Sequence, residues 1–184
     1  MDVWHVNVGL ETHEVLARTA RHRRVWVRSI RRFFGDTELL AVALPDTHGH
    51  LLVGGDRCEL GKRVHALECS LSWHLELTAG FRPAYFRQVQ DQRHLERAFD
   101  YVLGNGARHG SGSDPSQATT NLPDLLGARE ELAFTRAVVR TRLPRLGRDH
   151  LLGRLQLKPG EGRDPRRVIE AAEAAAVAAV GERG

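Results

Sequence analysis

The sequence predicts an α+β fold, because stretches with the periodicity of strands alternate with stretches that have the periodicity of helices. Residues 4–10 alternate apolar and polar side chains, which is the pattern of a half-buried strand. Residues 14–34 place apolar side chains at helical spacing, with arginines on the opposite side. The apolar residues 39–44 and 48–53 flank a Pro-Asp-Thr turn and are expected to form an antiparallel hairpin.

The following residues continue this alternation of helices and strands. Residues 57–78 carry leucine and valine at helical spacing and are expected to form a second long helix. A short strand is expected over residues 84–89, and Asp91 is a suitable N-cap for a third helix that ends near residue 103. The resulting order, βαββαβ followed by helices, is typical of a ferredoxin-like sandwich.

The chain is expected to have two parts. Residues 1–127 hold the predicted sandwich, and residues 111–120 within them are rich in Ser, Gly, Asp and Thr and are predicted to be a loop or linker. Residues 128–184 are expected to form a helical C-terminal extension. Helices that merely cover the sandwich are one interpretation of this extension.

The composition is that of a globular chain without a membrane segment. No apolar run approaches the roughly 20 residues that a membrane helix requires, so no membrane partner is expected. Residues 1–5 lack the basic and apolar regions of a secretion signal. Cys58 and Cys69 lie in one predicted helix and are expected to be reduced. Together these features favour a cytoplasmic location.

Positive charge is concentrated in one part of the chain. The formal net charge is +4 and the isoelectric point is about 9.7. Residues 15–34 carry seven arginines and no acidic residue. A basic row on one helix is a candidate phosphate-binding surface. A solvated helix face is an equally good interpretation of the same row.

Two short motifs contain residues that are suited to metal binding or catalysis. His48 and His50 are two residues apart on a predicted strand, so both imidazoles project from one face and can bind one divalent cation. Tyr101 and Asn105 are four residues apart on a predicted helix and share a face. Each motif also has a bland interpretation, as surface histidines beside a turn and as an interfacial tyrosine with a solvated hydroxyl.

A third motif joins aromatic residues to arginines. Residues 81–87, FRPAYFR, are predicted to be a turn that leads into a strand. Aromatic rings can stack on bases while arginines contact phosphates, so the motif is a candidate nucleic-acid contact. An ordinary aromatic strand edge is the alternative interpretation.

In combination these motifs resemble a known family. Residues 44–53, LPDTHGHLLV, look like the paired-histidine stretch of the IS200-like single-tyrosine (HUH) transposases. Residues 81–87 resemble the aromatic stretch that follows in that family, and residues 99–110, FDYVLGNGARHG, resemble its tyrosine signature. Residues 4–8, WHVNV, are similar to its opening strand. The order and spacing agree over residues 1–127, and the branch that is most similar is the REP-associated tyrosine transposases.

The resemblance implies a fold, a reaction and a set of site residues. It implies the ferredoxin-like sandwich, and a metal-dependent endonuclease and strand transferase that acts on single-stranded or hairpin DNA. Tyr101 corresponds to the nucleophile that forms a 5′-phosphotyrosine, with His48 and His50 as catalytic residues. Mg²⁺ or Mn²⁺ is the implied cofactor, with His48, His50 and Asn105 as its ligands. Family members act as monomers or as homodimers. The candidate DNA contacts are Arg21, Arg24, Arg28, Arg32, Arg82, Arg87 and Arg108. In some relatives a helical region after the catalytic domain contributes to DNA recognition, so a DNA-contacting surface is an equally good interpretation of residues 128–184.

One departure from the family pattern is relevant to the metal ligands. Gly49 stands between the histidines, where the family has a bulky apolar residue. Glycine lowers the stability of a strand, so we expect the two ligands to be held less firmly. Gly106 also departs from the pattern, because it replaces the proline that follows the asparagine in the family. Both glycines favour a second hypothesis, a domesticated DNA- or RNA-binding module without catalysis. A third hypothesis is a metal hydrolase that acts on small phosphates without using the tyrosine.

Overall fold

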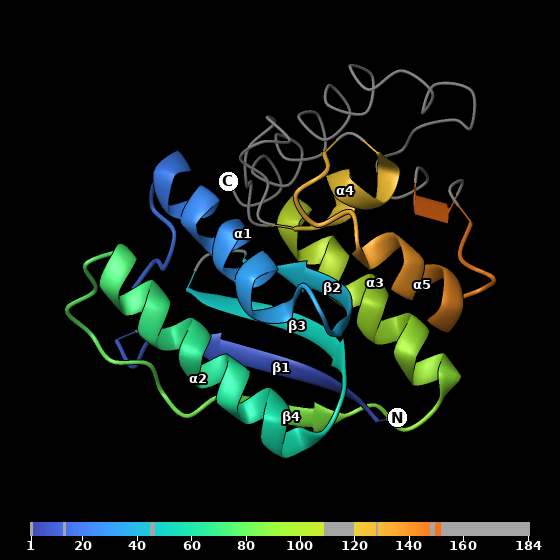
Figure 1. The fold of residues 1–184 in the computed structure, drawn as a ribbon, viewed down its shortest axis with the longest axis horizontal. Helices are drawn as coiled ribbons and strands as arrows, with labels where there is room; N and C mark the ends of the chain where they lie inside the picture. Colours follow the sequence, from blue (N-terminus) through green and yellow to red (C-terminus); the bar gives the residue numbers. More distant parts are fainter. Residues whose placement is uncertain are drawn as a thin grey trace.

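The computed structural model describes residues 2–12, 14–44, 47–108, 120–127, 129–147 and 150–151, with the backbone alone for residues 105–108. Its elements, in chain order, are β1 (Val3–Gly9), α1 (Ala20–Phe34), β2 (Glu38–Ala43), β3 (His48–Gly54), α2 (Arg57–His74), β4 (Tyr85–Gln88), α3 (Gln92–Arg108), α4 (Leu122–Leu126) and α5 (Thr135–Arg142). The α+β class that the sequence predicts is confirmed (Figure 1).

The four strands form one antiparallel sheet in the order β2-β3-β1-β4. β3 pairs with β2 and with β1, and β1 also pairs with β4. The hairpin that the sequence predicts is present as the adjacent strands β2 and β3. Because β1 and β3 are the central strands, their side chains have neighbours on both sides within the sheet.

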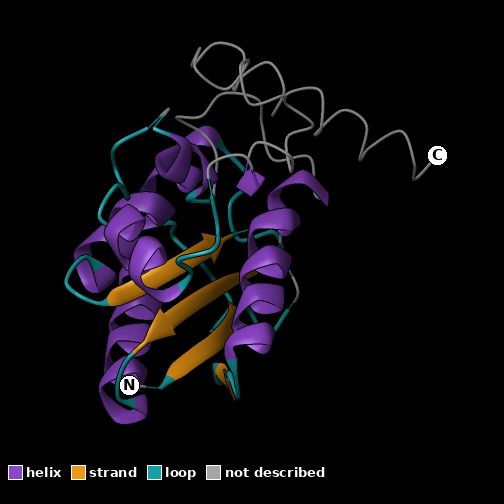
Figure 2. Cartoon of the chain, turned by 90° about the vertical axis from the view of Figure 1, so that its right-hand side faces the viewer, coloured by secondary structure: helices purple, strands orange, loops and turns teal. Residues whose placement is uncertain are grey.

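Helices cover both faces of the sheet (Figure 2). α1 and α2 pack on one face, over a core that includes Trp26 and Leu51. α3, α4 and α5 lie on the other face, over a core that includes Phe99 and Leu52. Leu51 and Leu52 are neighbours in β3 and point to opposite faces, as the alternation of a strand requires. The sheet therefore separates two cores.

α1 begins later than the sequence pattern indicates. A helix was expected over residues 14–34, but α1 starts at Ala20. The Thr19 hydroxyl accepts a hydrogen bond from the backbone N–H of His22 at 3.1 Å and caps the helix at this point. Leu16 is fully buried in the segment before the cap. Its burial accounts for the apolar spacing without a helical backbone.

A side chain pairs with the outer edge of β2. The Val42 N–H donates to Asn121 Oδ1 at 3.0 Å, and Asn121 Nδ2 donates to the Leu40 carbonyl at 2.9 Å. The Asn121 N–H also donates to the Val42 carbonyl at 3.3 Å. Asn121 is fully buried. It thus satisfies backbone groups that an edge strand would otherwise leave without protein partners.

α5 packs beside the same edge. Arg142 Nε donates to the Glu38 carboxylate of β2 at 2.9 Å, and Val139 is buried in the core below α3. Upstream of α5, Arg129 Nε donates to Asp124 Oδ2 at 2.9 Å in a buried ion pair. Residues 129–147 therefore pack on the same sheet as the residues before them. The division of the chain at residue 127 stays a prediction.

Candidate active site

Strand alternation brings the two histidines of β3 to one face of the sheet. His48 and His50 flank Gly49, so both imidazoles project to the side that α3 covers. On the neighbouring strand β1, Asn7 is the register partner of His50. The shared face that the sequence predicts for the two histidines is confirmed.

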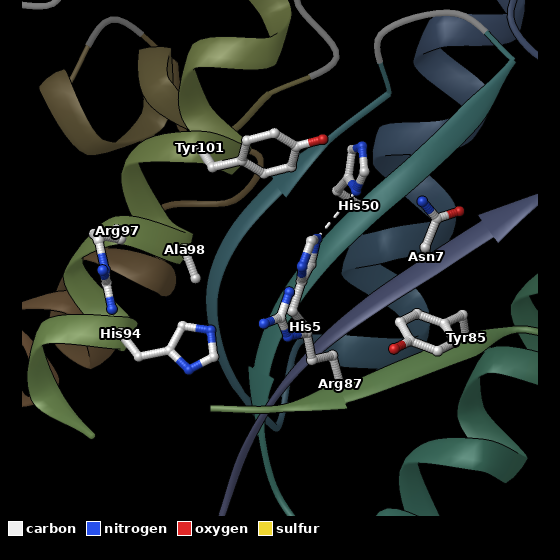
Figure 3. A pocket seen from close by; sticks show the side chains of 9 residues that line it. All are labelled: His5, Asn7, His50, Tyr85, Arg87, His94, Arg97, Ala98 and Tyr101. Atoms are coloured by element: carbon white, nitrogen blue, oxygen red, sulfur yellow. Dashed lines mark hydrogen bonds between the residues drawn. The ribbon is translucent and has the colours of Figure 1, made fainter. Parts of the chain in front are cut away.

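The same face continues across β1 to β4. His5 pairs with Arg87, and Asn7 pairs with Tyr85. Residues two apart on a strand share a face, so these four side chains lie on the side of His50. Figure 3 shows them along the floor of one cavity.

α3 forms the opposite wall of this cavity. His94, Arg97 and Tyr101 are separated by three and four residues, so successive helical turns present them on one side. On the other side of the helix, Phe99 is fully buried. Tyr101 is 43% exposed, and its hydroxyl points toward His50 (Figure 3). Tyr101 therefore lies outside the buried core.

The three residues proposed for chemistry lie together. The ring centroids of His48 and His50 are 4.6 Å apart, and those of His50 and Tyr101 are 5.4 Å apart. His50 is only 2% exposed, whereas His48 is partly exposed. The Thr47 hydroxyl lies 3.1 Å from His48 Nδ1 and orients this ring. A phenol hydroxyl and two imidazoles thus lie close together.

His5 adds a third imidazole to the site. Its Nε2 lies 3.1 Å from His50 Nδ1, within hydrogen-bond distance. Burial, followed by the charges of Arg87 and His94, lowers the pKa of His5. The lowered pKa favours the neutral form of His5, in which one ring nitrogen donates and the other accepts. The contact couples the tautomers of the two rings.

The cavity has a volume of about 380 Å³. Two arginines, Arg87 from β4 and Arg97 from α3, line it, and no carboxylate does so in the described part of the chain. The lining residues are His5, Asn7, His50, Tyr85, Arg87, His94, Arg97, Ala98 and Tyr101. An excess of positive charge in a concave site favours an anionic ligand.

The structure gathers some of the predicted site residues and separates others. Tyr101, His50 and Arg87 line the cavity. Arg82 lies nearby, because its Nη2 donates to Asn7 Oδ1 at 3.3 Å. The side chains of Asn105 and Arg108 lie outside the described residues.

The arginine row of the first helix is not part of this site. α1 turns Trp26, Ile30 and Phe34 toward the sheet, and these side chains are buried. Its arginines occupy the exposed side, and α1 covers the face opposite to α3. The predicted DNA contacts on this exposed side are Arg21, Arg24, Arg28 and Arg32. The sheet therefore lies between them and the cavity.

Gly49 has a packing partner that the sequence did not suggest. It faces away from the cavity, toward α1. A Cβ at this position would lie 2.5 Å from Cη2 of Trp26 and 3.1 Å from Cγ2 of Val8. The large indole of Trp26 thus occupies the space that a side chain at residue 49 would require. The indole therefore fills the space on the α1 side of β3, beneath the two histidines.

Several cavity residues were not predicted from the sequence to be part of the site. His5 and Asn7 alternate along β1, and His94 and Arg97 precede Tyr101 at helical spacing. Both periodicities were available in the sequence. The missing information was the register of β1 against β3, because only that register brings His5 to His50.

Comparisons of the chain with protein-family models, with curated proteins and with solved structures found no match. Among the described residues, no helix is both long enough and apolar enough to cross a membrane.

Proposed function

We propose that the chain is a metal-dependent enzyme that nicks and rejoins single-stranded or hairpin DNA. The observation that carries the proposal is the convergence of Tyr101 and His50 in a cavity with two arginines, with His48 beside His50. A phosphodiester is an anion that needs both charge neutralisation and a nucleophile, and these residue types supply both.

The fold proposed for this enzyme is the ferredoxin-like sandwich. The strand order β2-β3-β1-β4 supports it, because α1 connects β1 to β2 past β3, and α2 connects β3 to β4 past β1. Two such interleaved βαβ units are the arrangement expected from the βαββαβ pattern.

His48 and His50 are the proposed ligands of Mg²⁺ or Mn²⁺, with the amide of Asn105 as a third. The fit rests on two imidazoles that project from one strand face beside the nucleophile. His5 supports it, because an acceptor at His5 Nε2 keeps the proton of His50 on Nδ1 and leaves Nε2 able to bind a cation. When bound, the cation polarises the scissile phosphate and stabilises its developing charge.

Tyr101 is the proposed nucleophile of strand cleavage. Its Oη forms a bond to phosphorus while the bond to the 3′ oxygen breaks, which leaves a 5′-phosphotyrosine and a free 3′-hydroxyl. The phenol proton passes to solvent, and the departing 3′ oxygen takes up one proton. Attack by a 3′-hydroxyl reverses these steps and joins strands without a nucleotide cofactor.

A covalent adduct tests this proposal. Wild-type protein incubated with labelled hairpin DNA and Mn²⁺ is expected to give a protein–DNA band on a denaturing gel, with the adduct mapped to residue 101 by peptide mass spectrometry. Tyr101→Phe should abolish the band while it retains binding in an anisotropy titration.

Other results would redirect the proposal. An adduct that persists in Tyr101→Phe would exclude Tyr101 as the nucleophile. Binding without any adduct, with or without Mn²⁺, would identify a DNA- or RNA-binding module. Metal-dependent hydrolysis that is normal in Tyr101→Phe would identify a hydrolase of small phosphates.

A further inference from the structure

The end of the cavity farther from His48 holds two arginines, and the proposed function assigns neither of them to a particular phosphate. Arg87 reaches it from β4, and Arg97 reaches it from α3 on the opposite wall (Figure 3). Other arginines of the described chain pair with carboxylates and hold the fold together, namely Arg63, Arg129 and Arg142. Within the same described residues, neither Arg87 nor Arg97 has a carboxylate partner, so both are available to an anion.

His94 adds a further hydrogen-bond donor to the part of the cavity that holds these two arginines. The backbone N–H of Gln90 donates to His94 Nδ1 at 3.2 Å, so Nε2 is the ring nitrogen that carries a proton. The backbone N–H of His94 donates to Asp91 Oδ1 at 2.7 Å, which anchors the residue in the first turn of α3. The ring projects into the cavity (Figure 3). It therefore offers its Nε2–H group to a ligand in the cavity.

Tyr85 supplies an aromatic ring at the open edge of the same region. It precedes Arg87 by two residues on β4 and shares its face. The side chain is 65% exposed, whereas tyrosine rings usually bury most of their apolar surface. An exposed ring beside phosphate-binding groups is the arrangement on which single-stranded bases stack.

We propose that Arg87, Arg97 and His94 form a second phosphate subsite, which holds the phosphodiester next to the scissile one while its base stacks on Tyr85. The subsite rests on the proposed nuclease function, because it orients the strand that Tyr101 attacks. It makes the cavity a two-phosphate groove, with chemistry at the His50 end and strand positioning at the β4 edge. Its ligand is the backbone of single-stranded nucleic acid.

Binding without metal tests the subsite separately from catalysis. The probe is a fluorescent single-stranded hairpin oligonucleotide, titrated by anisotropy in EDTA. Arg87→Gln and Arg97→Gln should each reduce the magnitude of the slope of log K against log salt by about 0.7. The loss of affinity at 0.1 M salt should then be about five times the loss at 1 M salt. Lys62→Gln is the matched control, since it removes one exposed positive charge from α2 on the other face.

Neutral linkages locate the subsite along the strand. A methylphosphonate placed at the linkage next to the scissile one should weaken wild-type binding, and it should weaken binding by Arg97→Gln by a smaller factor, because Arg87 and His94 alone remain to contact that linkage. Tyr85→Leu should weaken binding by about 5- to 150-fold, and Tyr85→Phe should retain most of it, as stacking requires. Competition by inorganic phosphate at equal ionic strength distinguishes a free phosphate site from a strand site.

The outcomes separate the two proposals. Salt slopes equal to that of Lys62→Gln, or additive effects of the neutral linkage and Arg97→Gln, would overturn the subsite. Displacement of the strand by millimolar inorganic phosphate would reassign it to the free ion. Loss of the Tyr101 adduct with these binding effects intact would instead remove the nuclease proposal and leave the strand-binding groove.

Discussion

His5 Nε2 and His50 Nδ1 lie 3.1 Å apart, which links the central strand β1 to the proposed metal ligand on β3. Because burial lowers the pKa of His5 and favours its neutral form, this contact couples the tautomer of His50 to that of His5. The identity of residue 5 is therefore expected to influence the proposed metal affinity.

Replacement of His5 should weaken metal binding without unfolding the protein. His5→Leu removes the acceptor from His50 Nδ1, and Mn²⁺ affinity is expected to fall about 10- to 100-fold. His5→Gln keeps an acceptor oxygen and should recover part of the loss. Calorimetric titration with Mn²⁺ measures both variants, with the exposed His65→Gln as control. Equal affinities for His5→Leu and wild type would show that the contact does not orient the ligand.

Because Trp26 contacts Gly49, we expect a larger residue at position 49 to be tolerated better when residue 26 is smaller. Gly49→Val places atoms within the space of the indole, and we expect a loss of about 1–3 kcal/mol in the free energy of unfolding. In a Trp26→Leu background the same substitution should cost less, because the smaller side chain leaves room. Urea denaturation of the four proteins measures this coupling. Additive losses would contradict a direct steric relationship.

Glu68 on α2 predicts a pH dependence of stability. Burial raises its pKa to about 7, from 4.5 in the unfolded chain. Between these values the unfolded chain loses a proton that the folded protein keeps, so the free energy of unfolding falls as pH rises. The side chain is partly exposed and water screens the effect, so we expect a loss of about 1 kcal/mol between pH 4.5 and pH 8.

Glu68→Gln isolates that contribution. The variant cannot ionise at residue 68, so its advantage over wild type should increase as pH rises through 7. Urea denaturation at pH 5, 6, 7 and 8 measures the difference between the two proteins. Parallel pH curves would show that Glu68 has an ordinary environment in the folded protein.

Asn121 predicts a large loss of stability on truncation. Asn121→Ala leaves the Val42 N–H and the Leu40 carbonyl without their present side-chain partners, and each such buried group costs about 1–3 kcal/mol. We expect a total of about 2–4 kcal/mol by urea denaturation. Gln92→Ala removes an exposed hydrogen bond to Arg142 and should cost under about 1 kcal/mol. Similar losses in the two variants would argue against a structural role of the Asn121 side chain.

Local sequence patterns were sufficient to identify the residues that are proposed for chemistry. The spacing of His48 and His50 gives them one face of any strand, and the helix around Tyr101 needs only its apolar side buried. Long-range relationships were not predictable in this way. The approach of His5 to His50 depends on strand register, and that of Arg97 depends on how α3 crosses the sheet. The fit of Trp26 over Gly49 required both elements to be in place.

The contact of Asn121 with β2 also affects how two copies of this protein can associate. A second chain that extended the sheet at β2 would need the outward groups of Leu40 and Val42, and Asn121 already bonds to both residues. Growth of the sheet by edge-to-edge addition is therefore blocked on this side. At the opposite edge, β4 is a strand of four residues that carries Arg87. A continuous sheet across two copies would have to begin there, beside the cavity, so self-association by strand addition and access of a nucleic-acid strand would compete for the same edge.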